Sequence, residues 1–251
     1  MEAFNLTGEL ALITGGGSGL GLGIAERFVE AGARVVLVGR RQEVLQQQAE
    51  RLGGAVSCEA CDITRHERIP GLIERIENRC GPVTILVNNA GNHLKKPAVE
   101  TTVDEFRSVL DTHVLAAFGL SRAVLPGMID REQGNILFIA SMASFMGVPN
   151  VLAYSAAKSA YLGVVRTLSS EVSAHNVRIN AIAPGWIAHG MAQKVLDSDP
   201  ARKQKVLGRT PMNRLGEASD IGYAAVYLCS PAARFVTGVV LPVDGGASIG
   251  F

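Results

Sequence analysis

The sequence has little cysteine, almost no net charge and no long apolar run. Four cysteines in 251 residues are too few to cross-link the chain, so we expect reduced thiols in a cytoplasmic protein. A formal net charge of +1 gives no field that would draw the chain onto nucleic acid or an anionic membrane. Apolar runs stop short of the roughly 20 residues of a membrane span, and no secretory signal precedes the first one at Leu10. The expected partners are therefore small molecules and copies of the chain itself, with no nucleic acid and no membrane.

Two of the cysteines, Cys58 and Cys61, have the spacing of a redox or metal-binding pair. Both fall where a strand is expected, and residues three apart on a strand point to opposite faces. We therefore expect no metal site.

Short apolar runs alternate with longer stretches of helical period along the whole chain. Several of the strands, such as Ile136 to Ile139, are apolar on successive residues, which indicates that both faces are covered. This pattern predicts an α/β fold: a single Rossmann-type doubly wound domain over residues 1–251, with a seven-stranded parallel sheet between two helix layers. A polar, charged segment at about 186–214 interrupts the alternation and is expected to form a substrate lid.

A glycine-rich turn follows the first predicted strand, Leu10 to Thr14, and precedes a predicted helix. Glycines let the backbone approach a pyrophosphate closely, and the helix N-terminus offers free N–H groups and a positive dipole. A tight turn alone is the alternative interpretation, but strand, turn and helix in this order favour a dinucleotide site. The cofactor-binding residues expected here are Gly15, Gly17, Ser18, Gly19, Leu20 and Gly21.

The second predicted strand ends at Arg40 and Arg41, where an NAD-binding Rossmann unit places an acid for the ribose diol. Two guanidinium groups suit a 2′-phosphate, so NADP(H) is favoured as cofactor. NAD(H) is the alternative if these arginines only begin a solvated helix.

Three side chains have the chemistry for proton transfer to a carbonyl. Tyr154 and Lys158 are four apart at the start of a predicted helix, so they share one face, and a nearby ammonium stabilises phenolate. Ser141 follows an apolar strand and can hydrogen-bond the substrate oxygen; it lacks the Gly-x-Ser-x-Gly context of a hydrolase nucleophile. Tyr154 is expected to donate the proton in a reduction.

Five motifs in register resemble the short-chain dehydrogenase/reductase family over essentially the whole chain. They are Gly15-x-x-x-Gly19-x-Gly21, Asn88-Asn89-Ala90-Gly91, Ser141, Tyr154-x-x-x-Lys158 and Pro184-Gly185, and Val243-Asp244-Gly245-Gly246 closes the series. Within the family, the chain is most similar to the gluconate 5-dehydrogenase and 3-oxoacyl-carrier-protein reductase branches. The resemblance implies that Lys158 and Tyr154 also contact the nicotinamide ribose. Further cofactor contacts implied by it are Asp62, Ile63, Asn89, Ala90, Gly91, Pro184, Gly185 and Ile187. For Asp62, a cap on the helix expected from Arg65 is an equal alternative.

Two histidines depart from the family pattern. His113 stands where the family usually has an asparagine that holds a water near the catalytic lysine, so we include His113 among the catalytic residues. An imidazole could hold that water but would make the relay sensitive to pH; a core histidine satisfied locally is the alternative. His189 replaces a threonine that commonly binds the nicotinamide carboxamide.

The leading hypothesis is NADP(H)-dependent interconversion of a ketone and a secondary alcohol, on a small polar substrate such as a keto sugar or sugar acid. The alternatives are reduction of a 3-oxoacyl thioester and a non-catalytic nucleotide-binding sensor. Substrate contacts are expected from residues His93 to Pro97, Ser144 to Val151 and Trp186 to Leu207. The resemblance also implies a homotetramer, formed through the predicted helices Val103 to Met128 and Val151 to Ala174.

Overall fold

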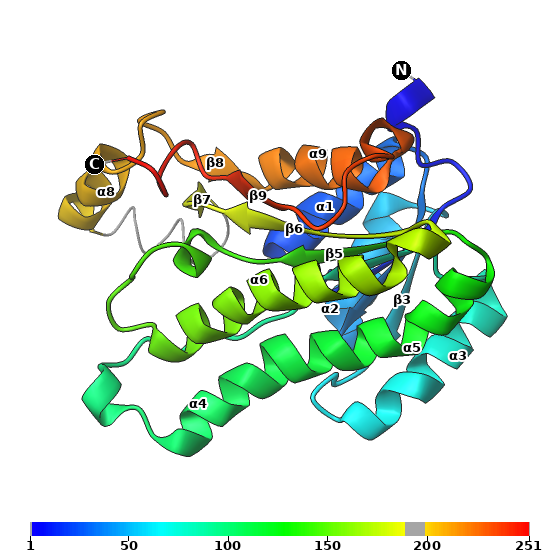
Figure 1. The fold of residues 1–251 in the computed structure, drawn as a ribbon, viewed down its shortest axis with the longest axis horizontal. Helices are drawn as coiled ribbons and strands as arrows, with labels where there is room; N and C mark the ends of the chain where they lie inside the picture. Colours follow the sequence, from blue (N-terminus) through cyan, green and yellow to red (C-terminus); the bar gives the residue numbers. More distant parts are fainter. Residues whose placement is uncertain (1, 189–198, 251) are drawn as a thin grey trace.

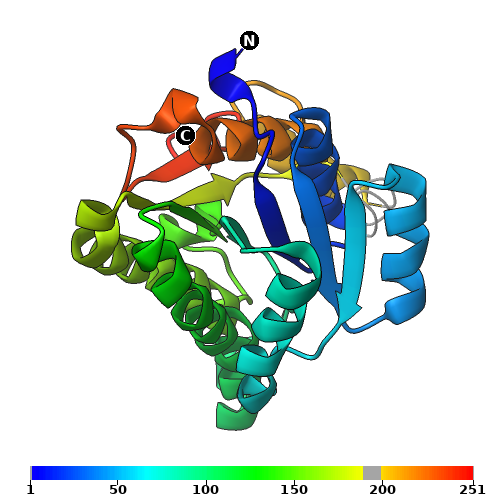
Figure 2. The same ribbon diagram turned by 90° about the vertical axis from the view of Figure 1, so that its right-hand side faces the viewer.

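Seven strands form one parallel sheet in the order β3-β2-β1-β4-β5-β6-β9, which confirms the predicted fold class. The structure, a computed structural model, describes residues 2–188 and 199–250. Figures 1 and 2 show the twisted sheet with helices on both faces. The strands are β1 (Leu10–Thr14), β2 (Arg34–Gly39), β3 (Val56–Ala60), β4 (Ile85–Asn88), β5 (Gly134–Ile139), β6 (Val177–Pro184) and β9 (Val240–Val243), with a separate pair β7 (Ile187–Ala188) and β8 (Gly216–Glu217).

The described residues form eight α-helices, and most of them pack on the two faces of the sheet. They are α1 (Gly19–Glu30), α2 (Gln42–Leu52), α3 (Ile69–Cys80), α4 (Val103–Leu110), α5 (Ala116–Asp130), α6 (Leu152–Val172), α8 (Pro200–Gly208) and α9 (Ala218–Cys229). Short 3-10 turns are η1 (Glu2–Phe4), η2 (His66–Arg68), η3 (Ala98–Glu100), η5 (Met142–Ser144), η6 (Ser173–His175) and η7 (Pro231–Ala233), and η4 (Asp111–Leu115) is a π turn.

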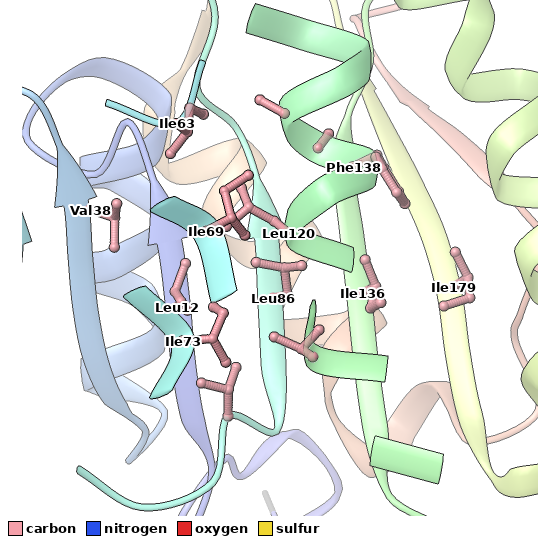
Figure 3. Packing of buried hydrophobic residues seen from close by; sticks show 14 of the residues in the cluster. Leu12, Val38, Ile63, Ile69, Ile73, Leu86, Leu120, Ile136, Phe138 and Ile179 are labelled. Carbon is pink, nitrogen blue, oxygen red and sulfur yellow. The ribbon is translucent and has the colours of Figure 1, made fainter. Parts of the chain in front are cut away.

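Each sheet face carries its own apolar core. On one face, strand residues such as Leu86 and Ile136 pack against α3, α5 and α6, as Figure 3 shows with Ile69 and Leu120. On the other face, residues such as Ile13 pack against α1, α2 and α9. Burial on both faces explains why these strands are apolar on successive residues. At about 25 cal/mol per Å² of apolar surface, this double burial is the main favourable term in folding.

The predicted single helix from Val103 to Met128 is divided by the π turn η4, which follows α4 directly and leads into α5. A π turn takes one residue more than an α turn and is frequent at functional sites. Helical residues Val103–Asp130 are long and apolar enough to cross a membrane by length and composition alone. Leu120, Val124 and Met128 on this helix are buried in the core of the sheet, as in core helices of soluble domains.

The segment expected to form a lid, at about 186–214, contains β7 and α8, and β8 follows it closely. β7 pairs with β8, so the start of the segment lies beside the residues that follow its end. Residue 189, and with it the expected carboxamide contact of His189, lies outside the described residues.

Candidate active site

The carboxyl ends of four neighbouring strands carry the predicted motifs. The glycine turn follows β1, Asn89 follows β4, Ser141 follows β5 and Gly185 follows β6, and these strands are adjacent in the sheet. In an open parallel sheet this edge, where the strand order reverses beside β1, is where ligands bind. The topology therefore gathers motifs that are up to 170 residues apart, from Gly15 to Gly185.

The glycine turn is shaped by close backbone approaches. Gly15 and Gly19 have positive φ values of 66° and 57°. A Cβ on Gly21 would lie 2.5 Å from both the Gly15 carbonyl oxygen and Asn89 Nδ2. Ser18 is the N-cap of α1 and makes no side-chain cap hydrogen bond, which leaves the first-turn N–H groups of α1 for another acceptor. Backbone donors and a cradle without side chains fit a diphosphate.

Asn89 and Thr14 tie the glycine turn to the end of β4. Asn89 Nδ2 donates to the Thr14 carbonyl at 2.8 Å, and the Thr14 hydroxyl accepts from the N–H groups of Asn89 and Ala90, both at 3.1 Å. The same hydroxyl donates to the Val87 carbonyl. Thr14 was not among the predicted site residues, although a polar residue ending a buried strand was a signal for such a contact.

The ends of β2 and β3 carry three charged residues, Arg40, Arg41 and Asp62. Gly39 pairs with Ala60 in register, so Arg40 and Asp62 follow neighbouring strands. Hydrogen bonds from Thr64 lower the pKa of Asp62, and the charges of Arg40 and Arg65 act in the same direction. Arg40 and Arg41 are both exposed, and neither forms an ion pair with any acid in residues 2–188 and 199–250. They fit an anionic ligand on that side of the turn.

The alternative role of Asp62 as a helix cap is wrong. Its carboxylate accepts hydrogen bonds from the N–H and hydroxyl of Thr64, whereas α3 begins only at Ile69 with Arg68 as N-cap. Neighbouring Ile63 is buried at the carboxyl end of β3 and belongs to the apolar core.

The predicted nicotinamide side lies where β6 ends. Pro184 is the last residue of β6, and the Gly185 N–H donates to the Val243 carbonyl at 3.1 Å. A Cβ on Gly185 would approach the Asp244 Cα to 2.6 Å, so a glycine is required for the two backbones to meet. Ile187 is buried in β7 and packs in the core beside α9.

Ser141, Tyr154 and Lys158 converge where β5 ends and α6 begins. Ser141 is buried, and its hydroxyl accepts from the Ala143 N–H at 3.1 Å. Burial raises the pKa of Tyr154, and a hydrogen bond with the Ser141 side chain acts in the opposite direction. Lys158 Nζ lies 5.7 Å from the centroid of the Tyr154 ring. The predicted trio is therefore one cluster.

Lys158 is a buried amine that faces a carbonyl and two phenol rings. Nζ donates to the Ile139 carbonyl at 2.5 Å and lies 5.0 Å from the Tyr161 ring centroid. Burial lowers the pKa of Lys158 to about 7. The expectation that Lys158 lowers the pKa of Tyr154 is not met in the free chain: burial dominates for both groups and disfavours both charged forms.

His113 lies beside this cluster on the π turn. Its ring is 5.6 Å from the Tyr154 ring in an edge-on arrangement, and its Nε2 lies 2.8 Å from the Asn92 carbonyl oxygen. The Asn92 N–H also lies 3.2 Å from Nε2, so the Asn92 backbone can pair with this nitrogen in either tautomer of the ring. Nδ1 is buried and has no hydrogen-bond partner among the described residues. The alternative was a core histidine whose polar atoms are satisfied locally. Only one of the two ring nitrogens, Nε2, is satisfied by the described residues.

The expected pH sensitivity of His113 is wrong. Burial, together with the charge of Lys158, lowers the pKa of His113 to about 3. The imidazole is thus neutral at every pH at which the protein is expected to work. The backbone carbonyl of His113 accepts a hydrogen bond from the buried Tyr161 hydroxyl at 2.7 Å.

Three further residues belong to this cluster: Tyr161 was not predicted, and His93 and Ser144 were expected only within general substrate regions. Tyr161 lies two turns after Tyr154 on α6, a spacing that placed it on the same helix face. Ser144 donates to the Lys158 carbonyl at 2.8 Å. His93 stacks on Tyr154 with ring centroids 4.9 Å apart and an interplanar angle of 23°. His93 had been assigned only to a general substrate region, because nothing in the sequence shows which way a loop side chain points.

Cys58 and Cys61, the two cysteines with the spacing of a pair, lie near the carboxyl end of β3. Cys58 lies within β3 and Cys61 just after it, and both are free thiols. Within residues 2–188 and 199–250, no three histidine, cysteine, aspartate or glutamate side chains are grouped so that they could hold a metal ion.

A Rossmann sheet, a glycine turn and a serine, tyrosine and lysine cluster at one sheet edge define the class of short-chain dehydrogenases. The family model described as "Enoyl-(Acyl carrier protein) reductase" matches residues 15–248. The chain therefore belongs to the short-chain dehydrogenase/reductase family and is an oxidoreductase.

Three relatives illustrate the range of this similarity. A 3-oxoacyl-[acyl-carrier-protein] reductase from Vibrio cholerae is 34% identical over 242 residues, covering 96% of this chain and 98% of that protein. A gluconate 5-dehydrogenase from Burkholderia cenocepacia, solved with NADP and tartrate, has a TM-score of 0.95 and 32% identity, covering 100% and 99% of the two chains. A 7α-hydroxysteroid dehydrogenase solved with NADH and 7-oxo glycochenodeoxycholic acid has a TM-score of 0.92 and 37% identity, covering 98% and 96%.

Proposed function

We propose that this chain transfers a hydride between NADP(H) and a ketone or secondary alcohol. The observation that carries the proposal is the convergence of Ser141, Tyr154 and Lys158 at the carboxyl ends of the central strands, beside a turn that fits a diphosphate. These three groups supply a hydrogen-bond donor for a carbonyl oxygen, a proton and a cation.

In the direction of reduction, the Ser141 hydroxyl and the Tyr154 phenol both hydrogen-bond the carbonyl oxygen. The nicotinamide supplies the hydride when it is bound. When the carbonyl carbon gains a hydride and the C=O π electrons move to oxygen, Tyr154 would give its proton to that oxygen, which becomes the alcohol. Lys158, in its charged form, stabilises the phenolate that remains, and the reverse sequence oxidises the alcohol.

The residues that would hold the dinucleotide lie along one edge of the sheet. Backbone N–H groups of the glycine turn and of Ser18, Leu20 and Gly21 would bind the diphosphate. Asp62 and Ile63 would contact the adenine side, and Asn89, Ala90 and Gly91 the adenosine and central strand. On the nicotinamide side the contacts would come from Tyr154, Lys158, Pro184, Gly185 and Ile187.

Arg40 and Arg41 support NADP(H) over NAD(H) for this chain. Both guanidinium groups are exposed at the end of β2, where a 2′-phosphate would meet them, and Arg40 is close enough to Asp62 to lower its pKa. A bidentate arginine–phosphate contact is a strong charge-assisted interaction. NAD(H) is the alternative, since relatives of this chain have been solved with either NADP or NADH.

We propose that His113 contributes as a neutral hydrogen-bonding group rather than as a titrating group. A buried polar atom without a partner is rare in folded proteins and is commonly satisfied by an ordered water. We propose that one water bridges His113 Nδ1 and Lys158 Nζ, which has donors left after its bond to Ile139. Such a water would return a proton to the site after each reduction.

The substrate that fits best is a small polar ketone such as a keto sugar or sugar acid. The similarity to a gluconate 5-dehydrogenase over the full chain supports this class, and the similarity to a 3-oxoacyl reductase supports a thioester as the second candidate. We also propose that the chain works in the cytoplasm as a homotetramer. Exposed Leu115, Phe118 and Leu152 on the π turn, α5 and α6 offer apolar surface for such an assembly.

A coenzyme and substrate panel tests the proposal. 5-Keto-D-gluconate, D-fructose and acetoacetyl-coenzyme A would each be offered with NADPH and with NADH, and the loss of nicotinamide absorbance measured. We expect the highest kcat/KM for the keto sugar acid with NADPH. A preference for acetoacetyl-coenzyme A would select the second candidate, and no consumption with any ketone would favour the nucleotide-binding sensor.

A further inference from the structure

The loop between β4 and α4 places an imidazole directly on the ring of Tyr154. His93 is exposed, whereas Tyr154 beneath it is partly buried, and the two rings are stacked 4.9 Å apart and 23° from parallel. The edge of the Tyr154 ring is met from another side by the buried ring of His113. Of the two histidines on the phenol, His93 is therefore the one that faces the mouth of the site.

The loop that carries His93 is anchored immediately before it. His113 Nε2 lies 2.8 Å from the Asn92 carbonyl oxygen, and the His113 ring also occupies the space where a Cβ on Gly91 would be. The buried histidine of the π turn therefore holds the backbone of residues 91 and 92. Any substitution of His113 is expected to displace His93 as well.

The same loop is anchored again just after His93. Leu94 packs on the small apolar cluster formed by Val109 of α4 with Ala153 and Ala157 of α6. Two residues later, the Lys96 N–H donates to the Asn150 carbonyl at 2.7 Å. The segment from 92 to 96 is thus fixed to α4, to α6 and to the residues just before α6, which gives the exposed His93 a defined position.

The chemistry of this position is that of a hydrogen-bonding group beside the reacting carbonyl. A carbonyl oxygen that takes the Tyr154 proton must lie within hydrogen-bond distance of the phenol. An imidazole stacked on that phenol presents its two nitrogens at the ring edge, one as donor and one as acceptor when neutral. A substrate whose carbonyl oxygen is hydrogen-bonded to the phenol would bring the atoms next to that carbonyl toward the stacked imidazole.

We infer that His93 is a specificity-determining residue that hydrogen-bonds a hydroxyl on the carbon next to the reacting carbonyl, and so selects α-hydroxy ketones over simple ketones. The inference rests on the proposed function, because it assumes that Tyr154 is the proton donor. A keto sugar or keto sugar acid carries such a hydroxyl next to its ketone, whereas a 3-oxoacyl thioester does not. His93 therefore separates the two candidate substrate classes.

Two roles of His93 can be distinguished by three variants. His93→Phe keeps a ring on Tyr154 and removes the hydrogen bond, His93→Gln keeps hydrogen-bonding atoms and removes the ring, and His93→Ala removes both. Val99→Ala, at a fully exposed position further along the loop, is the matched control.

The probes are 1-hydroxy-2-butanone and 2-butanone, which differ by one hydroxyl, and the measurement is the ratio of their kcat/KM values with NADPH. We expect the wild type and Val99→Ala to prefer the hydroxy ketone by about tenfold, the value of one hydrogen bond. His93→Phe should lower this ratio to near one, mainly through KM for the hydroxy ketone, and His93→Gln should restore part of it. His93→Ala should lose the ratio. His93→Ala and His93→Gln should both show a kcat several-fold lower on both ketones, because the ring that fixes Tyr154 is gone.

The outcomes separate the inference from the proposed function. Turnover of both ketones with the same ratio in the wild type and His93→Phe would overturn the role of His93 and leave the proposed function standing. Turnover of neither ketone, nor of any compound in the substrate panel, would contradict the proposed function and the inference with it. Equal losses on both ketones in all three variants would show that His93 only positions Tyr154.

Discussion

The nucleotide side and the carbonyl side of the site differ in exposure and in the kind of group that they offer. On the nucleotide side, the glycine turn offers backbone N–H groups, and Arg40 and Arg41 are exposed to solvent. On the carbonyl side, Lys158 and His113 are 3% and 2% exposed, and burial shifts the pKa of each. The groups of the nucleotide half are therefore open to water, whereas those of the carbonyl half are kept away from it. Substitutions in the two halves should therefore affect different measurements.

The largest effect is expected on the carbonyl side, from Tyr154→Phe. Removing the phenol hydroxyl removes the proton donor, so kcat should fall by about 10³-fold, a typical contribution of general acid catalysis. NADPH affinity should change little, because the ring remains.

The control for this variant is Tyr223→Phe, an exposed tyrosine on α9. Steady-state rates and a fluorescence titration with NADPH would measure both quantities. A Tyr154→Phe enzyme that works within a few-fold of the wild type would show that the proton comes from elsewhere.

A smaller effect is expected on the nucleotide side, where Arg40→Ala and Arg41→Ala should change coenzyme affinity rather than kcat. Loss of a charge-assisted phosphate contact should raise KM for NADPH by about 10- to 100-fold, while KM for NADH stays the same. Arg166→Ala, an exposed arginine on α6, is the control. If NADPH and NADH are affected equally, these arginines do not bind the 2′-phosphate.

Gly21→Ala tests whether the turn requires a residue without a side chain at position 21. Its Cβ would lie 2.5 Å from a backbone oxygen, and such overpacking is expected to cost about 1 to 3 kcal/mol in unfolding free energy, in NADPH binding, or in both. Gly163→Ala on α6, with no heavy atom within 4 Å of its Cβ, should instead stabilise the chain by up to about 1 kcal/mol. Urea denaturation with and without NADPH distinguishes the two positions, and equal behaviour of both variants would contradict the tight turn.

The smallest effect is a pH dependence of stability from His113. Its pKa is about 3 in the folded chain and 6.5 when unperturbed, so below pH 6.5 the unfolded chain binds a proton that the folded chain does not. The free energy of unfolding should therefore fall as pH falls from 6.5 toward 3, by up to about 1.4 kcal/mol per pH unit from this group.

His113→Asn should remove that part of the slope, and His175→Asn, an exposed histidine, should keep it. Urea denaturation at pH 6.5 and pH 5 gives the difference, expected to be about 2 kcal/mol between the wild type and His113→Asn. The same slope in both proteins would mean that His113 is not desolvated in solution.

The regular elements were predictable because their apolar pattern records which faces are buried. The bounds of β1 agree with those expected, Leu10 to Thr14, and the order of motifs placed Ser141, Tyr154 and Lys158 together. The division of the helix at η4 was not predictable, since one extra residue in a turn leaves no mark in a side-chain pattern. For the same reason, the contacts of His113 with Asn92 and of His93 with Tyr154 follow only from the three-dimensional path of the loop.

The bonds of Thr14 and Asn89 have a mechanical consequence. They join β1, which leads into the nucleotide half, to β4, which leads into the carbonyl half, within one continuous sheet. The junction between the two halves is therefore held by side-chain hydrogen bonds as well as by strand pairing, and we do not expect it to act as a hinge. We expect the movement that admits and releases ligands during turnover to come from segments beyond the sheet edge.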